Sequence, residues 1–136
     1  MSVRIDIEYT GDLHSECVHE PSASRIQTDA PVDNEGRGET FSPTDLVATA
    51  LGSCVLTTMG IVARRHEWPM DGATATVHKH MTTDPVRRIG RLEARFAMPG
   101  SIPKDARKVL ERAAHTCPVH RSLHPDVEVE LAFDWP

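Results

Sequence analysis

Residues 42–66 read SPTDLVATALGSCVLTTMGIVARRH, and this stretch decides the fold class. Ser42, Pro43 and Asp45 resemble a capping box, with serine as the cap, proline at the first helical position and a carboxylate in the first turn. Apolar residues then recur every three or four positions until residues 64–66, whose basic side chains suit the carboxyl end of a helix dipole. The pattern predicts one central helix of roughly two dozen residues, about 35 Å long.

Small residues occur repeatedly along this predicted helix. They lower helix propensity but let another backbone approach closely. The apolar stripe is also broad, so we expect the helix to be nearly surrounded by other elements. The small residues are Ala48, Ala50, Gly52, Ser53 and Gly60.

The chain before the helix has the pattern of a small sheet. Residues 3–10 alternate strictly between apolar and polar side chains, as in a half-buried strand, and residues 13–20 and 24–29 are weaker strand candidates. These three segments predict an antiparallel meander. Residues 30–41 contain proline, glycine and charge without a periodic apolar face, which predicts a loop.

The chain after the helix returns to strands. Residues 73–81 and 92–98 alternate and predict a hairpin, and residues 127–134 predict a closing strand. Between the hairpin and the closing strand, residues 99–115 have the spacing of a second helix, opened by Pro103. Strands that are grouped before and after helices, rather than alternating with them, predict an α+β fold.

Length and composition limit the organisation of the protein. With 136 residues and no linker-like tract, residues 1–136 are expected to form a single domain. Aromatic residues make up only 4% of the chain, so we expect a partner subunit to supply part of the core. The net charge is −5 and no basic stripe is present, which argues against a nucleic-acid partner.

The sequence also predicts a compartment. The first residues lack the apolar segment of a signal peptide, and the apolar run within residues 42–66 is expected to be too short to span a membrane. An odd count of three cysteines argues against a secreted disulfide framework. We therefore expect a cytoplasmic protein with no membrane partner.

Cys54 lies on the apolar face of the predicted central helix. It is well past the first turn, so the helix dipole cannot activate its thiol. Activation would need a cation, for which Arg25 and Arg37 are the candidates. By its local pattern alone, Cys54 is expected to be a small buried side chain.

Cys117 has a different setting, in the stretch TCPVHRSL. Pro118 predicts the start of a short helical turn, which would place the sulfur at a helix amino terminus beside His115 and His120. Such surroundings lower a thiol pKa, so local chemistry ranks Cys117 as the better activated thiol. Cys17 has no partner motif and is expected to be structural.

The histidines suggest a metal site as an alternative to thiol chemistry. His78 and His80 share one face of a predicted strand, and His115 and His120 flank Cys117. The spacings match neither a zinc finger nor an HExxH helix, so solvated histidines are favoured over metal ligands. No phosphate-binding loop or dinucleotide fingerprint is present, and no cofactor is expected.

Two stretches resemble the OsmC/Ohr family of osmotically inducible and organic-hydroperoxide-resistance proteins. They are SPTDLVATALGSC at residues 42–54 and CPVHRSL at residues 117–123. The resemblance implies an α+β fold in which antiparallel sheets pack on central helices within an intertwined homodimer. It places the two central helices back to back and builds each active site from both chains.

The resemblance also implies roles for the thiols. The cysteine matching Cys54 attacks a hydroperoxide, and the cysteine matching Cys117 resolves the sulfenic acid as a disulfide, which an external dithiol then reduces. An arginine, here Arg25 or Arg37, would hold Cys54 ionised. The resemblance implies that the hydroperoxide branch of the family pairs this arginine with a glutamate ten positions before the helix cysteine, where this chain has Thr44.

Two functions therefore stand as hypotheses. The first is a cysteine-based peroxidase that uses Cys54 and Cys117 on organic hydroperoxides or hydrogen peroxide. The alternative is a non-enzymatic dimeric stress protein that binds a small ligand or a metal and whose thiols are not catalytic.

Overall fold

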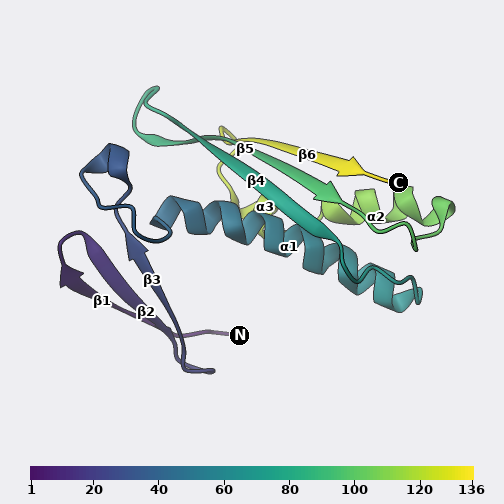
Figure 1. Cartoon of the computed structure of the whole chain (residues 1–136), viewed down its shortest axis with the longest axis horizontal. Coiled ribbons are helices and arrows are strands. Elements are labelled where there is room, and N and C mark those ends of the chain that lie inside the picture. Colours follow the sequence, from purple (N-terminus) through teal and green to yellow (C-terminus); the bar gives the residue numbers. More distant parts are fainter. The chain divides into compact units, whose positions relative to one another are not determined.

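The structure is a computed structural model that describes residues 1–136. The chain forms two compact units, Met1–Val47 and Ala48–Pro136 (Figure 1). Both contain one three-stranded sheet. The expectation of a single domain over residues 1–136 stays a prediction.

The smaller unit contains the predicted meander. Its strands pair antiparallel in the order β1-β2-β3, and a short 3-10 helix, η1, follows in the loop. The bounds are β1 Ile5–Gly11, β2 His14–His19, β3 Ser24–Asp29 and η1 Val32–Asn34.

One face of this sheet is apolar and uncovered. The strand register places Ile7, Cys17 and Ile26 side by side. Ile7 is 66% exposed and Ile26 is 50% exposed. The expectation of a half-buried first strand is wrong for the single chain, because none of the residues of β1 is buried.

The central helix, α1, spans Pro43–Arg65 and confirms the prediction from residues 42–66. Its start is a capping box: the Ser42 N–H donates to Asp45 Oδ2 at 2.9 Å, and the Asp45 N–H donates to Ser42 Oγ at 3.0 Å. By length and composition α1 could cross a membrane, so the expectation of too short an apolar run is wrong.

The larger unit contains the second sheet, in the order β4-β5-β6. The β4–β5 pair is the predicted antiparallel hairpin, whereas β5 and β6 are parallel. The expectation of purely antiparallel sheets is wrong here, because the chain crosses back through two helices before it re-enters the sheet. The bounds are β4 Thr74–Thr82, β5 Arg88–Ala97 and β6 Glu128–Asp134.

The second helix, predicted within residues 99–115 to open at Pro103, starts with a 3-10 turn directly after that proline. A 3-10 turn, η2, spans Lys104–Ala106, and α2 spans Arg107–Ala114. Prolines at 99 and 103 and a glycine at 100 keep the preceding segment out of the helix. The short turn predicted after Cys117 is confirmed as α3, Pro118–Ser122.

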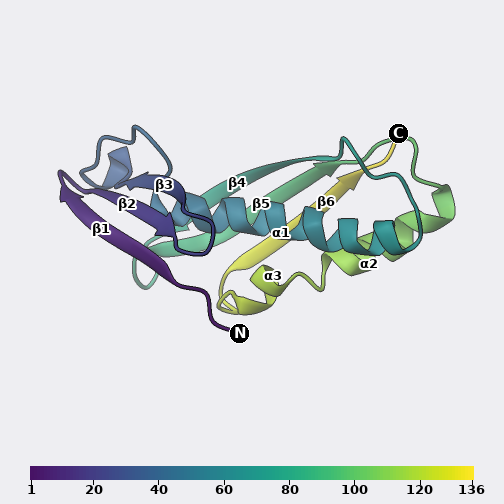
Figure 2. The ribbon, with the colours of Figure 1, turned by 90° about the horizontal axis from the view of Figure 1, so that it is seen from below.

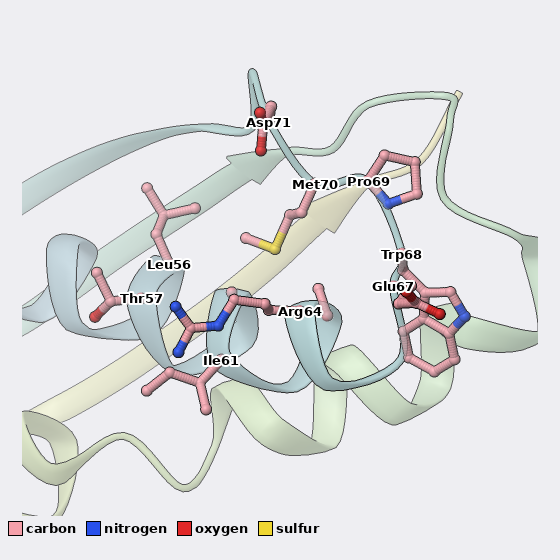
Figure 3. Close-up of a pocket in the computed structure, with 11 residues that line it drawn as sticks. Leu56, Thr57, Ile61, Arg64, Glu67, Trp68, Pro69, Met70 and Asp71 are labelled. Carbon is pink, nitrogen blue, oxygen red and sulfur yellow. The ribbon is translucent and has the colours of Figure 1, made fainter.

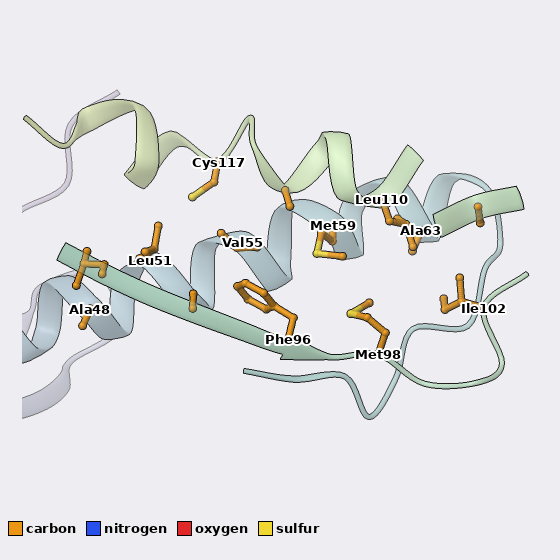
Figure 4. Close-up of a cluster of buried hydrophobic side chains, with 14 residues drawn as sticks. Ala48, Leu51, Val55, Met59, Ala63, Phe96, Met98, Ile102, Leu110 and Cys117 are labelled. Atoms are coloured by element: carbon orange, nitrogen blue, oxygen red, sulfur yellow. The ribbon is translucent and has the colours of Figure 1, made fainter. Parts of the chain in front are cut away.

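The core of the larger unit lies between its sheet and its helices. Figures 1 and 2 show α1, α2 and α3 on one side of β4-β5-β6. Figure 4 shows the buried side chains that fill this space, including Leu51, Val55, Phe96, Leu110 and Cys117. These five side chains are fully buried, at 0% exposure.

Only one face of α1 is covered by the chain. Ser53, Thr57 and Ile61 are exposed, so the expectation of a nearly surrounded helix is wrong for the single chain. The expected close approach occurs at Gly52, where an added Cβ would lie 2.9 Å from Val77 Cγ2 of the chain's own sheet. At Gly60, nothing would lie within 4 Å of an added Cβ.

Candidate functional site

The structure brings the two predicted redox thiols together. Cys54 lies in the middle of α1 and is half-buried, whereas Cys117 precedes α3 and is fully buried. Figure 4 shows the Cys117 side chain pointing from the segment between α2 and α3 toward α1. Both residues belong to the larger unit, and the two free thiols lie close enough for each to shift the other's pKa.

The surroundings of Cys54 favour its thiolate. Burial by itself raises the pKa of the Cys54 thiol. Hydrogen bonds with the Cys117 side chain, the Val119 N–H and the Thr58 hydroxyl outweigh burial and hold this pKa below its ordinary value. None of these three groups carries a charge, so neutral hydrogen-bond donors stabilise the anion.

The surroundings of Cys117 favour its neutral thiol. Burial raises the pKa of Cys117, and the hydrogen bond with Cys54 raises it further. The N–H groups of His120 and Val119 act in the opposite direction but do not reverse the shift. The expectation that Cys117 is the better ionised thiol is therefore wrong, because a fully buried sulfur is a poor place for a charge.

This pair of thiols is chemically unequal. Cys54 is half-buried and carries the charge more readily, whereas the neighbouring Cys117 keeps its proton. A thiolate is the nucleophilic form of cysteine, and a neighbouring thiol can condense with an oxidised sulfur. The arrangement is suited to attack by Cys54 followed by disulfide formation with Cys117.

The two candidate arginines belong to the smaller unit. Arg25 Nη1 in β3 lies 3.9 Å from Glu16 Oε2, and Arg37 Nη2 in the following loop lies 3.7 Å from Asp12 Oδ2. Both side chains are mostly exposed to solvent. Their role as the cation near Cys54 stays a prediction.

The first turn of α1 holds Thr44. Thr44 Oγ1 lies 3.2 Å from the Ser42 hydroxyl, and so belongs to the helix cap. The neighbouring Asp45 carboxylate accepts the Ser42 N–H. Thr44 therefore offers a hydroxyl but no negative charge at this position.

Comparison with known proteins identifies the family. The sequence model of the family described as OsmC-like protein matches residues 36–132, which include α1, both redox thiols and most of β6. The chain belongs to the OsmC-like protein family. No curated protein sequence is significantly similar to this OsmC-like chain.

Solved structures agree with this assignment. A Psychrobacter arcticus 273-4 protein, described as a proposed osmotic stress induced and detoxification response protein, is 42% identical, with a TM-score of 0.90 over 96% of this chain and 94% of that one. An organic hydroperoxide resistance protein OsmC from Legionella pneumophila is 16% identical, with a TM-score of 0.76 over 98% and 97%. The organic hydroperoxide resistance protein OhrB of Bacillus subtilis, also 16% identical, has a TM-score of 0.73 over 98% of both chains. The two more distant structures show a shared OsmC fold.

The histidines of this OsmC-like chain are dispersed. His78 and His80 are exposed on β4, and His80 Nε2 lies 3.4 Å from Glu93 Oε1. His115 is exposed, and the buried Nδ1 of His120 has no hydrogen-bond partner. No group of three or more His, Cys, Asp or Glu side chains is arranged to hold a metal ion.

A groove on the OsmC-like chain was not predicted from the sequence. It has a volume of about 820 Å³, and its lining residues come from the second half of α1 and the loop before β4. Figure 3 shows Leu56, Ile61, Trp68 and Met70 around it together with Arg64. Neither redox thiol lines this groove. The exposed apolar Ile61 on an otherwise core-forming helix is the signal that could have indicated it.

Proposed function

We propose that this protein is a thiol-dependent peroxidase that reduces organic hydroperoxides or hydrogen peroxide. The observation that carries the proposal is the pairing of the half-buried Cys54 with the buried Cys117 beside it, with the pKa of the first lowered and that of the second raised. The hydroperoxide-resistance names of the Legionella and Bacillus proteins support a peroxide substrate. The stress and detoxification description of the Psychrobacter protein supports the same role.

The reaction begins at the Cys54 thiolate. Its sulfur attacks one peroxide oxygen, the O–O bond breaks, and the leaving oxygen takes up a proton to depart as an alcohol or as water. The Cys117 thiol then attacks the resulting sulfenic sulfur, which forms the disulfide and releases water. An external dithiol returns two electrons and two protons to restore both thiols.

The active assembly in this proposal is a homodimer in the cytoplasm. The uncovered apolar face of β1, β2 and β3 supports the homodimer, because large exposed apolar patches are typical of interaction surfaces. A dimer also gives each Cys54 two chains from which Arg25 or Arg37 can come. The guanidinium would stabilise both the thiolate and the charge on the leaving oxygen.

A single peroxide pulse tests the reaction. One equivalent of tert-butyl hydroperoxide is expected to remove two of the three titratable thiols, and mass spectrometry should find a Cys54–Cys117 linkage. Peroxide consumption should fall at least about 1,000-fold in Cys54→Ser, because the attacking atom is lost. The matched control Cys17→Ser should keep the parent rate.

The same peroxide pulse distinguishes the peroxidase from the alternative, a non-enzymatic binding protein. Thiols that survive excess hydroperoxide and hydrogen peroxide unchanged would contradict the peroxidase and favour a non-enzymatic binding protein. Equal peroxide consumption by the parent and Cys54→Ser chains would also contradict it. Arg25→Ala and Arg37→Ala, compared in the same assay, identify the activating arginine by a lower rate in one of the two.

A further inference from the structure

Two adjacent threonines on α1 use their hydroxyls differently. Thr57 is exposed, and its Oγ1 donates to the carbonyl oxygens of Ser53 at 3.0 Å and Cys54 at 3.1 Å. Thr58 is half-buried, and its Oγ1 lies 3.9 Å from Cys54 Sγ. The four-residue spacing puts Thr58 and Cys54 on the same helix face, one turn apart.

We propose that Thr58 is a thiolate-stabilising residue, whose hydroxyl donates a hydrogen bond to the Cys54 sulfur in its reactive form. A thiolate can only accept hydrogen bonds, whereas a neutral thiol can also donate one, so a fixed hydroxyl favours the anion. A bond to a charged acceptor is shorter and stronger than a neutral one, and the contact is therefore expected to tighten when Cys54 ionises. The inference rests on the proposed function only for the reactivity of Cys54.

Few groups stabilise the Cys54 thiolate, so the hydroxyl of Thr58 is expected to have a measurable effect. The thiolate is supported by the Cys117 side chain, the Val119 N–H and the Thr58 hydroxyl, and by no charged group of the larger unit. Cys117 is itself consumed in the proposed reaction, and the Val119 N–H belongs to the backbone. Thr58 is thus the one supporting group that can be replaced without altering the thiol pair or the backbone.

Alkylation measured without peroxide tests the proposal. The rate at which iodoacetamide modifies Cys54 is followed against pH by mass spectrometry of the Cys54 peptide. In Thr58→Val, which keeps the side-chain shape, we expect the midpoint to move to higher pH and the rate at pH 7 to fall about threefold to tenfold. Thr58→Ser should restore the parent profile.

The neighbouring threonine provides the matched control. Thr57→Val removes a hydroxyl from the same helix but not from the sulfur, so its alkylation profile should equal that of the parent. Equal midpoints for the parent and Thr58→Val, or equal displacement in Thr57→Val, would overturn the proposal. If Thr58→Val fails to fold, Thr58→Ala carries the same test, because alanine is the best helix former.

The outcomes also separate this inference from the peroxidase proposal. A displaced alkylation midpoint in Thr58→Val, combined with a parent chain that does not consume peroxide, supports the role of Thr58 and contradicts the peroxidase. Peroxide consumption by the parent, combined with an unchanged midpoint in Thr58→Val, supports the peroxidase and overturns the role of Thr58.

Discussion

The two sheets of the molecule each have three strands, but only one of them is covered by the chain's own helices. In β4-β5-β6, the side chains of Leu92, Ala94 and Phe96 are buried, with at most 2% of their surface exposed. In β1-β2-β3, Ile7 is 66% exposed and Tyr9 is 64% exposed. No helix of the smaller unit packs on them, because that unit has only a 3-10 turn and the first turn of α1.

The difference between the two sheets shows what an alternating pattern of apolar and polar residues can predict. Both β1 and β5 alternate between apolar and polar residues, and both are strands. Alternation therefore identifies a strand with one apolar face, but it does not identify what covers that face. In the proposed homodimer, the uncovered sheet is the surface that needs the second chain.

Truncating a buried side chain of the covered sheet β4-β5-β6 should cause the largest loss of unfolding free energy. Phe96 is fully buried and stacks on Phe133 at a centroid distance of 5.3 Å. Phe96→Ala is expected to lower the free energy of unfolding by about 3–5 kcal/mol, through lost burial and a cavity. Urea denaturation measures the loss. Phe41→Ala, at a residue 52% exposed, should change it by no more than about 0.5 kcal/mol, and similar losses in both would contradict the comparison.

Two glycines of α1 compare its covered and open faces within one helix. At Gly52, a new Cβ would press on Val77, so Gly52→Ala should cost about 1–3 kcal/mol of unfolding free energy. At Gly60 the space is open, and Gly60→Ala should stabilise by about 0.5–1 kcal/mol through helix propensity. Thermal unfolding checks both signs. Destabilisation by Gly60→Ala would show that a partner chain fills the open face.

A substitution on the apolar face of the uncovered sheet β1-β2-β3 should weaken the association of two chains. Ile7→Asp places a charge on the apolar face, and if that face meets a second chain, the charge is buried without a partner. We expect the dimer dissociation constant to increase at least about tenfold, an effect of roughly 1.4 kcal/mol. Analytical ultracentrifugation over a concentration series measures it. Glu8→Gln, on the opposite face of β1, is the control, and an unchanged dimer in Ile7→Asp would exclude this sheet from the interface.

Local signals in the sequence predicted most of the elements. The capping box at Ser42 and the basic end at residues 64–65 gave the bounds of α1, and alternation located β1, β4, β5 and β6, whereas β2 and β3 were weaker candidates. The parallel pairing of β5 with β6 was missed because it depends on residues far apart in the chain. Pro103 located the start of the second helical segment, although its first turn is the 3-10 turn η2 rather than α-helix.

The candidate thiol site could be predicted only in part from the sequence. The thiol pair came from the resemblance to a family, and local chemistry ranked the two thiols in the wrong order. The error has a physical cause: the helical turn after Cys117 is a local feature, whereas the complete burial of its sulfur is tertiary. Thr58 could have been found, because a hydroxyl four residues after Cys54 on a helix lies on the same face.

The smallest expected effect lies in the smaller unit and appears only in acid. Asp29 is 5% exposed; its Oδ1 lies 2.6 Å from His14 Nδ1, and its Oδ2 accepts the Glu39 N–H at 3.0 Å. The hydrogen bond from His14 outweighs burial and, with the Glu39 N–H and the charges of His14 and Arg37, holds the pKa of Asp29 below its ordinary value.

A carboxylate whose pKa is lower in the folded than in the unfolded state stabilises the folded state at pH values above the unfolded pKa. This stabilisation is lost as the pH falls through the folded pKa. Asp29→Asn should therefore give a flatter dependence of unfolding free energy on pH below about pH 4, where carboxylates ordinarily titrate. Urea denaturation at a series of pH values measures the slope. Asp12→Asn, at an exposed carboxylate, should follow the parent curve. Parallel curves for the parent and Asp29→Asn chains would show that the ionised Asp29 adds nothing to the stability of the folded state, and that His14 and the loop after β3 are held by other contacts.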